Sequence, residues 1–159
     1  MEDIIICEAT MDDKNEMNVI RKQVNDLHVA GESKIFKPGF NENMASFCET
    51  FIKNEQGKKA LVAKENGKVV GYALLEFVFK EETDYRFTQR FLEVGEFGVL
   101  EGNKKKGIGR KLVERIRLIA KENGYDEIRL DMWSFNEGAL KFYEAVGFET
   151  YRRHMRTGV

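Results

Sequence analysis

The sequence predicts an α/β fold in which a mixed sheet is covered by helices on its faces. Short runs with the two-residue period of strands alternate with longer runs in which apolar residues recur every three or four positions. The expected order of elements is β-α-α-β-β-β-α-β-α-β. This order combines a hairpin, whose strands are antiparallel, with helices of the kind that connect parallel strands, so a mixed sheet is expected.

Length and composition set limits on the class of protein. The chain has 159 residues, which suits one domain, and no repeat or linker divides residues 1–159. Lysine and arginine total 26 against 27 acidic residues. The net charge is therefore close to zero and gives no reason to expect nucleic acid or a membrane as a partner. Cys7 and Cys48 lack metal-ligand spacing and follow no secretory leader, so we expect reduced thiols in a cytoplasmic protein.

The first part of the chain is expected to form one strand and two helices. Residues 4–7 are a short apolar run typical of a strand. Apolar residues at positions 17–27 recur with helical spacing, and Gly31 follows where this helix should stop. The spacing of apolar residues at 47–52 indicates a second helix, after a loop that contains the only proline, Pro38.

A hairpin and a further strand are expected next. Two apolar runs within residues 60–79 flank an Asn-Gly dipeptide at 66–67, which is a strong signal for a tight hairpin turn. Residues 91–100 read as another strand that contains Gly95 and Gly98. A glycine inside a strand indicates either a bulge or the close approach of other atoms.

The last third of the chain predicts a helix, a strand, a helix and a strand. From 108 to 124 the apolar residues form one helical face and the charged residues the other, until a glycine ends the helix. Residues 127–133 read as a strand, and a second helical stripe at 139–146 stops at Gly147. The final strand is expected to begin at Phe148.

The loop before the helix at position 108 has the features of an anion-binding site. The first N–H groups of a helix have no partner within the helix, and the peptide dipoles place a partial positive charge there. Gly107 and Gly109 let an anion approach the main chain, and the lysines at 104–106 add charge. The loop lacks the Gly-Lys-Ser/Thr of a Walker loop, and Leu112 stands where a dinucleotide fingerprint needs glycine.

Two ordered motifs in residues 92–148 resemble the GNAT superfamily of acyl-CoA-dependent N-acyltransferases. The family pattern V-x-x-x-x-[QR]-x-x-G-x-[GA] is matched by Val99 and the following KKKGIG, with Lys104 at the Gln/Arg position. Lysine keeps the positive charge there but loses the forked geometry of arginine. The second pattern, N-x-x-A-x-x-x-Y-x-x-x-G-F, is matched in full by NEGALKFYEAVGF at positions 136–148.

The resemblance implies acetyl-CoA as a cosubstrate, no metal, and a mostly antiparallel sheet that splays between the fourth and fifth strands. The pantetheine arm would enter between the strand at 91–99 and the strand at 127–132, as an added strand does. The residues implied in cofactor binding are Phe97, Gly98, Val99, Leu100, Lys104, Lys105, Lys106, Gly107, Ile108, Gly109, Arg110, Asn136, Ala139 and Phe142. Asn136 also reads as the N-cap of its helix.

An amine with a pKa near 10.4 is neutral in only about one molecule in 2,500 at pH 7, so the reaction needs a base. Glu96 and Glu93 lie on the strand beside the expected thioester. Glu96 is preferred because, if Phe97 and Val99 pack into the core, strand alternation points Glu96 to the other face, toward the ligand. A bulge between the two glutamates would bring Glu93 to the same side. The resemblance further assigns the backbone N–H of Val99 or Leu100 to the oxyanion, and the hydroxyl of Tyr143 to the departing sulfur.

The expected reaction is direct transfer of an acetyl group to a primary amine in a ternary complex, because no acyl-enzyme nucleophile is evident. The acceptor is a small molecule or a peptide. It would lie over the first two helices, where Phe36 and Phe40 are candidates for an apolar wall. A homodimer is one way to complete this site. The alternatives are transfer of a longer acyl group, and a binding module without activity that senses acyl-CoA or binds nucleic acid.

Overall fold

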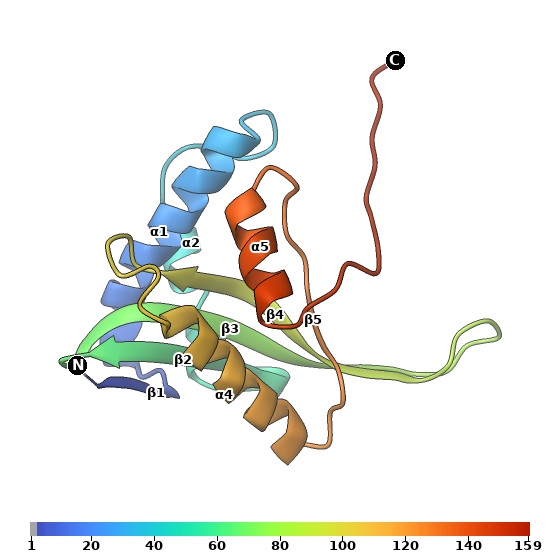
Figure 1. The fold of residues 1–159 in the computed structure, drawn as a ribbon, viewed down its shortest axis with the longest axis horizontal. Helices are drawn as coiled ribbons and strands as arrows, with labels where there is room; N and C mark the ends of the chain where they lie inside the picture. The colour runs from blue at the N-terminus through green and yellow to red at the C-terminus, as the bar shows by residue number, and fades with distance from the viewer. Residues whose placement is uncertain (1–2) are drawn as a thin grey trace.

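The computed structural model describes residues 3–159, which form a five-stranded sheet flanked by helices (Figure 1). The strand order is β1-β2-β3-β4-β5. Each neighbouring pair is antiparallel except β4 and β5, which are parallel, so the predicted mixed, mostly antiparallel sheet is confirmed. The strands are β1 Ile4–Glu8, β2 Lys58–Glu65, β3 Lys68–Lys80, β4 Gln89–Val99 and β5 Ile128–Leu130.

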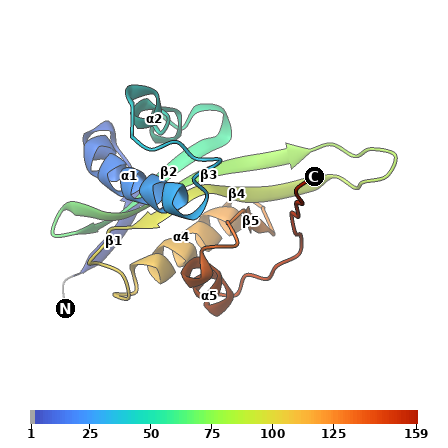
Figure 2. The same cartoon turned by 90° about the horizontal axis from the view of Figure 1, so that it is seen from above.

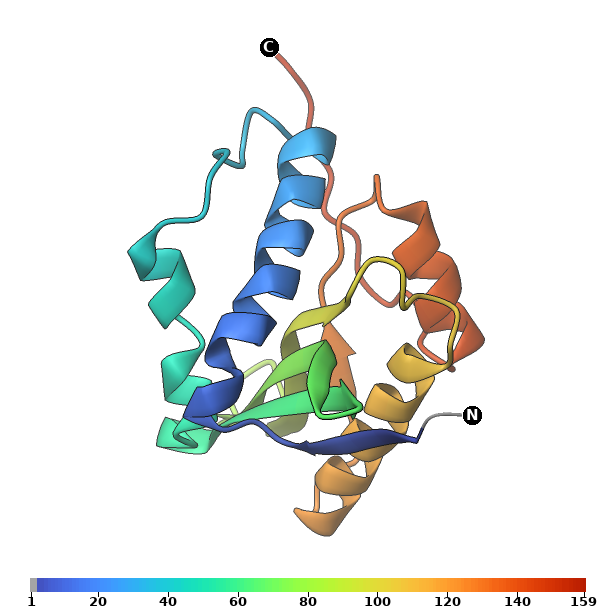
Figure 3. The same cartoon turned by 90° about the vertical axis from the view of Figure 1, so that its left-hand side faces the viewer.

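Helices cover both faces of the sheet, as Figures 2 and 3 show. The helices α1 and α2 lie over one face, and α4 and α5 lie over the other. Within residues 3–159, none of the helices is long and apolar enough to cross a bilayer. The helices are α1 Lys14–Gly31, α2 Glu42–Ser46, α3 Glu49–Ile52, α4 Ile108–Glu122 and α5 Glu137–Ala145, with 3-10 turns at Met11–Asp13 and Glu55–Gly57.

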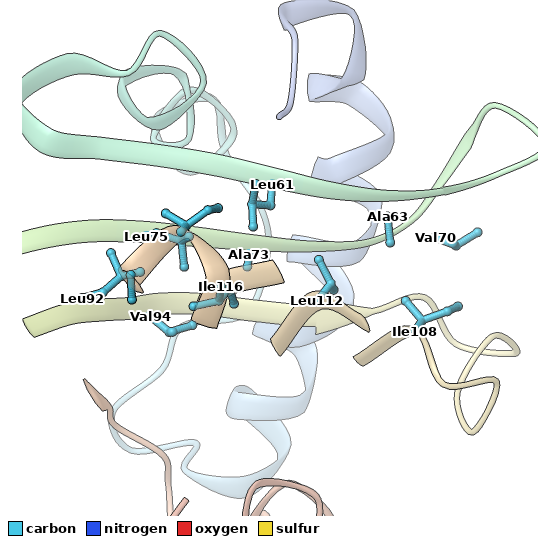
Figure 4. Close-up of a cluster of buried hydrophobic side chains, with 12 residues drawn as sticks. Leu61, Ala63, Val70, Ala73, Leu75, Leu92, Val94, Ile108, Leu112 and Ile116 are labelled. Atoms are coloured by element: carbon cyan, nitrogen blue, oxygen red, sulfur yellow. The ribbon is translucent and has the colours of Figure 1, made fainter. Parts of the chain in front are cut away.

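The apolar stripe of α4 packs on the sheet and forms the larger core cluster (Figure 4). Its residues at positions 108, 112 and 116 follow the spacing of a single helical face, and each is almost fully buried. Gly71 on β3 lets this helix approach closely, because a Cβ there would lie 2.9 Å from Cγ2 of Ile108. On the opposite face, Met17 and Ile20 of α1 are fully buried against Tyr72 and Leu74 of β3.

The register between β3 and β4 shifts by one residue at Gly95. Leu74 pairs with Glu96 and Leu75 with Val94, so Gly95 is the extra residue of a β-bulge. The predicted bulge is therefore present. Because a one-residue shift reverses the facing of the side chains that follow it, Glu93 and Glu96 lie on the same face of the sheet, the one that α1 covers.

The pairing of β5 with β4 ends at Val94. Only residues 92–94 of β4 have partners on β5, and within the described chain the segment 95–99 has no strand on that side. We call residues 95–99 the open edge of β4. The expected splaying of the sheet between the fourth and fifth strands is thus confirmed, and β5 is shorter than the strand predicted at 127–133.

Two sequence-based predictions of secondary structure were wrong. The predicted second helix is two short helices, α2 and α3, separated by Phe47 and Cys48. The predicted final strand from Phe148 is an extended, largely exposed tail that follows α5 and joins no strand of the sheet (Figure 1). Side chains rather than backbone pairing hold this tail, since Arg156 forms an ion pair with Glu32 (2.5 Å).

Truncating the stripe of α4 should test the importance of this core. We expect Leu112→Ala to lower the free energy of unfolding by about 2–5 kcal/mol, because the side chain is fully buried and its loss leaves a cavity. Leu118→Ala on the same helix is the control, since Leu118 is 51% exposed. Urea unfolding followed by circular dichroism measures both. Equal losses for the two variants would contradict this account of the core.

Candidate active site

The helix α5 packs beside the open edge of β4 through aromatic side chains. The ring of Phe97 on β4 lies 5.8 Å from that of Phe142 and 6.0 Å from that of Tyr143. Gly109 in the first turn of α4 makes room for this contact, because a Cβ there would lie 2.9 Å from Cζ of Phe142. The glycine expected to admit an anion therefore also admits α5.

The N-terminus of α4 is open and free of acidic residues in its first turn. Gly107 is the N-cap residue, with φ at +80°, and a Cβ built on it would meet no atom within 4 Å. The three lysines at 104–106 are exposed. Lys104 contacts Glu101 at 2.7 Å in an exposed pair, which is a weak interaction, and Lys106 lies at the longer distance of 3.6 Å from Glu65. The geometry fits an incoming diphosphate.

The end of β4 is fixed to β3 and to α1. The N–H of Leu100 donates to the carbonyl of Val70 (2.9 Å), so it is not free for a ligand. Since backbone groups alternate along an antiparallel pair, the N–H of Val99 points away from β3, to the side that β5 has left. Gln23 of α1 donates to the carbonyl of Val99 (3.0 Å) and accepts from the N–H of Glu101 (2.7 Å).

Glu96 is held by a buried arginine that the sequence analysis missed. Nε of Arg21 donates to Oε2 of Glu96 (2.7 Å) and Nη2 donates to Oε1 (3.0 Å), while the hydroxyl of Tyr72 donates to Oε2 (3.0 Å). The Arg21 side chain is 6% exposed and that of Glu96 is 27% exposed. Burial opposes the charge of Arg21, but the hydrogen bonds and charge of Glu96 raise the pKa of its guanidinium.

The position of Arg21 in the sequence carried a signal for this role. It follows the apolar stripe of α1 at Met17 and Ile20, so a helix packed on the sheet must bury it. A buried charge needs a partner of opposite sign. Arg21 also donates through Nη1 to the carbonyl of Met44 (2.6 Å), which links α1 to α2.

Tyr143 is half-buried among aromatic rings at the open edge of β4. Its ring lies 5.3 Å from that of Phe142 and 5.5 Å from that of Phe148. Burial raises the pKa of its hydroxyl to about 12, so this hydroxyl is a proton donor throughout the neutral range. Asn136 is the N-cap of α5, as one of its two readings predicted, because its Oδ1 accepts from the N–H of Ala139 (3.0 Å).

Four aromatic rings connect the last turn of α1 and the loop after it to the loop before α5. His28 stacks on Phe36 (4.9 Å), and Phe36 meets Trp133 edge to face (5.1 Å). Phe135 completes the group at 6.1 Å from His28. We call these residues the aromatic cluster. Trp133 is 36% exposed, because it packs on loops rather than on the sheet. Phe40 instead lies against Arg21 (5.6 Å).

A mixed sheet that opens beside a helix N-terminus defines the class of acyl-CoA-dependent N-acyltransferases. Residues 22–148 match the model of the Acetyltransferase (GNAT) family, and the chain belongs to this family. It is 30% identical over 107 residues to N-alpha-acetyltransferase 50 of Danio rerio, a match that covers 65% of this chain and 60% of that protein. The chain therefore spans less than two thirds of that relative.

Solved structures share the fold over nearly the whole chain. A tetramutant of the BH1408 protein from Bacillus halodurans has a TM-score of 0.92 at 27% identity, covering 98% of this chain and 99% of that one. The aminoglycoside N-acetyltransferase AAC(6')-Iy in complex with CoA has a TM-score of 0.78 at 16% identity, covering 100% and 96%. At 16% identity, the match to AAC(6')-Iy shows only that the two proteins share a fold.

The ion pair of Arg21 should contribute more to stability than an exposed pair on the same helix. We expect Arg21→Met to cost about 2–3 kcal/mol, because it leaves Glu96 unpaired in a partly buried place. Lys22→Met, which removes an exposed pair with Asp26, should change little. Thermal and urea unfolding compare the two variants. A loss for Arg21→Met no larger than for Lys22→Met would contradict the role of this pair.

Proposed function

We propose that the protein is an N-acetyltransferase that transfers the acetyl group of acetyl-CoA directly to a primary amine in a ternary complex. The observation that carries this proposal is the open edge of β4 next to the acid-free N-terminus of α4. A free strand edge can pair with an extended amide-bearing arm, and a helix N-terminus can bind a diphosphate. Acetyl-CoA has both an amide-bearing pantetheine arm and a diphosphate, and it supplies an activated acetyl thioester.

The residues proposed to hold the cofactor come from three elements. The N–H groups from Gly107 to Arg110 and the three lysines at 104–106 would bind the diphosphate. The outward backbone groups of Phe97 would pair with the pantetheine amides and the N–H of Val99 would face the thioester, while Gly98 and Leu100 hold the strand against β3. Asn136, Ala139 and Phe142 would form the wall on the side of α5.

The chemistry proposed for this chain uses one backbone group and two side chains. The N–H of Val99 would donate to the carbonyl oxygen of the acetyl group as that oxygen gains charge. Tyr143, protonated at neutral pH, can donate to the leaving sulfur. Glu96 is preferred as the group that accepts the proton of the amine, directly or through a water. Glu93 lies on the same face and is the alternative.

The ion pair between Arg21 and Glu96 bears on the role proposed for Glu96. Two donors of Arg21 and one of Tyr72 already occupy its oxygens, and they hold the carboxylate in one orientation. A carboxylate held in this way can orient the ammonium group of the acceptor. The ammonium group can then lose its proton to a water molecule bound beside the carboxylate. The cytoplasmic location, the metal-free reaction, the single domain and the homodimer remain predictions.

Removing the lysines of the loop should weaken acetyl-CoA binding. We expect the double variant Lys105→Gln/Lys106→Gln to bind acetyl-CoA about tenfold less tightly, because each lysine offers a charge-assisted hydrogen bond to phosphate. The loss should shrink at high salt. Lys121→Gln, at the other end of α4, is the control. Isothermal titration calorimetry gives the dissociation constants, and no uptake of acetyl-CoA by the wild type would refute the proposed function.

Changes at Glu96 and Tyr143 should affect turnover rather than cofactor binding. We expect Glu96→Gln to lower kcat by about a hundredfold or more, the usual range for loss of a general base. Tyr143→Phe should also lower kcat, with acetyl-CoA affinity unchanged for both. Release of the free thiol from acetyl-CoA measures turnover, and Glu82→Gln on the β3–β4 loop is the control. Full activity of Glu96→Gln would move the role to Glu93.

A further inference from the structure

We propose that the acceptor is a monoamine whose amino group is carried on an apolar, preferably aromatic, body, and that polycations are poor acceptors. This inference rests on the proposed function, because it concerns the acceptor side of the same site. Two independent observations on the face covered by α1 carry it. One is the aromatic cluster, and the other is the balance of charge around Glu96.

The aromatic cluster lies on the acceptor side of the site. His28 is two helical turns after Arg21, so both project from the same side of α1. Burial lowers the pKa of the His28 imidazole, and the negative charge of Glu96 has a smaller, opposite effect on it. The cluster is therefore largely uncharged at neutral pH, and His28 connects it to the side of α1 from which Arg21 binds Glu96.

The cluster is not a closed core. Trp133 is 36% exposed, and Phe36 and Phe135 are half-buried. Nearby, Arg21 is covered by the rings of Phe40 and Phe47, each 5.6 Å from its guanidinium carbon. Partly exposed rings of this kind offer apolar area that a bound molecule can cover, and aromatic groups pack well against them.

The charges on this face are mixed in sign, which disfavours an extended polycation. The charge of Glu96 is balanced by Arg21, and Glu32 at the end of α1 is balanced by Arg156 (2.5 Å). The loop that carries Phe36 has two lysines, Lys34 and Lys37. Attraction of a polycation requires several carboxylates that are not neutralised by neighbours. Glu93 lies opposite Glu76 on this face, and within residues 3–159 neither forms an ion pair. These carboxylates and Glu96 can receive one ammonium group, while the two lysines beside the cluster would repel a second one.

Two sources could supply an amine of this chemistry. One is a small arylalkylamine, and the other is the N-terminus of a peptide whose first residue is large and apolar. Both present a primary amine within two or three carbons of an apolar group. The shared chemistry is what the cluster would recognise, and separate probes distinguish the two sources.

The test compares probes in the thiol-release assay with acetyl-CoA. The small probes are 2-phenylethylamine, n-butylamine and spermidine, and the peptide probes begin with phenylalanine or with serine. We expect kcat/KM for 2-phenylethylamine or the phenylalanine peptide to exceed that of its smaller counterpart by about tenfold or more, as burial of a ring predicts. Spermidine as the best acceptor would overturn the inference but leave the proposed function intact.

Trp133 provides a readout that does not depend on turnover, because it is the only tryptophan in the sequence. With CoA bound, titration with 2-phenylethylamine should change its fluorescence and saturate, while spermidine should not. If acetyl-CoA does not bind, the proposed function fails and the inference fails with it. If acetyl-CoA binds and no amine in the panel is acetylated or changes the fluorescence, the inference is overturned on its own evidence.

A change in the cluster should act on apolar acceptors alone. We expect Phe36→Ala to raise KM for 2-phenylethylamine by about tenfold with kcat largely kept, and to leave n-butylamine unchanged. Retained acetyl-CoA binding checks that this variant is folded. Phe87→Ala, at the far exposed loop between β3 and β4, is the control. An equal effect on both amines would show that Phe36 acts on the fold and not on acceptor choice.

Discussion

The bulge at Gly95 is the constraint on which the arrangement of the site depends. One extra residue in β4 brings Glu93 and Glu96 to the face of α1, while Phe97 and Val99 pack on the side of α4. The pairing with β5 ends just before the bulge, so the backbone beyond it pairs with β3 on one side and has no strand partner within residues 3–159 on the other. The acid side chains and the free backbone thus lie on one short stretch of chain.

Much of the fold could be predicted because its signals are local. The hairpin turn at Asn66 and Gly67 has positive φ at both residues, the requirement that made Asn-Gly diagnostic. The apolar stripe of α4 and the glycine at its N-cap fixed the helix and its open end. The splayed sheet followed from a resemblance between motifs, since no local pattern in β4 or β5 encodes where two strands part.

The rest depends on contacts between distant parts of the chain. Glu96 was singled out as the preferred base, but its partner Arg21 lies 75 residues away in the sequence and can be recognised only when α1 is placed on the sheet. Gly109 was read as a site for an anion, whereas Phe142 also requires it. The segment after Phe148 has the composition of a strand, yet a strand needs an edge to pair with, and the tail runs past β5 without pairing.

The two hydrogen bonds of Gln23 have a consequence for how the two substrates affect each other. One turn of α1 holds Arg21 against Glu96 and Gln23 against the start of the lysine loop. A helix turn is stiff, so a shift on the side proposed to receive the amine would also move the backbone proposed to bind the diphosphate. Affinity for either substrate would then depend on the presence of the other, and thermodynamic linkage requires such a dependence to be reciprocal.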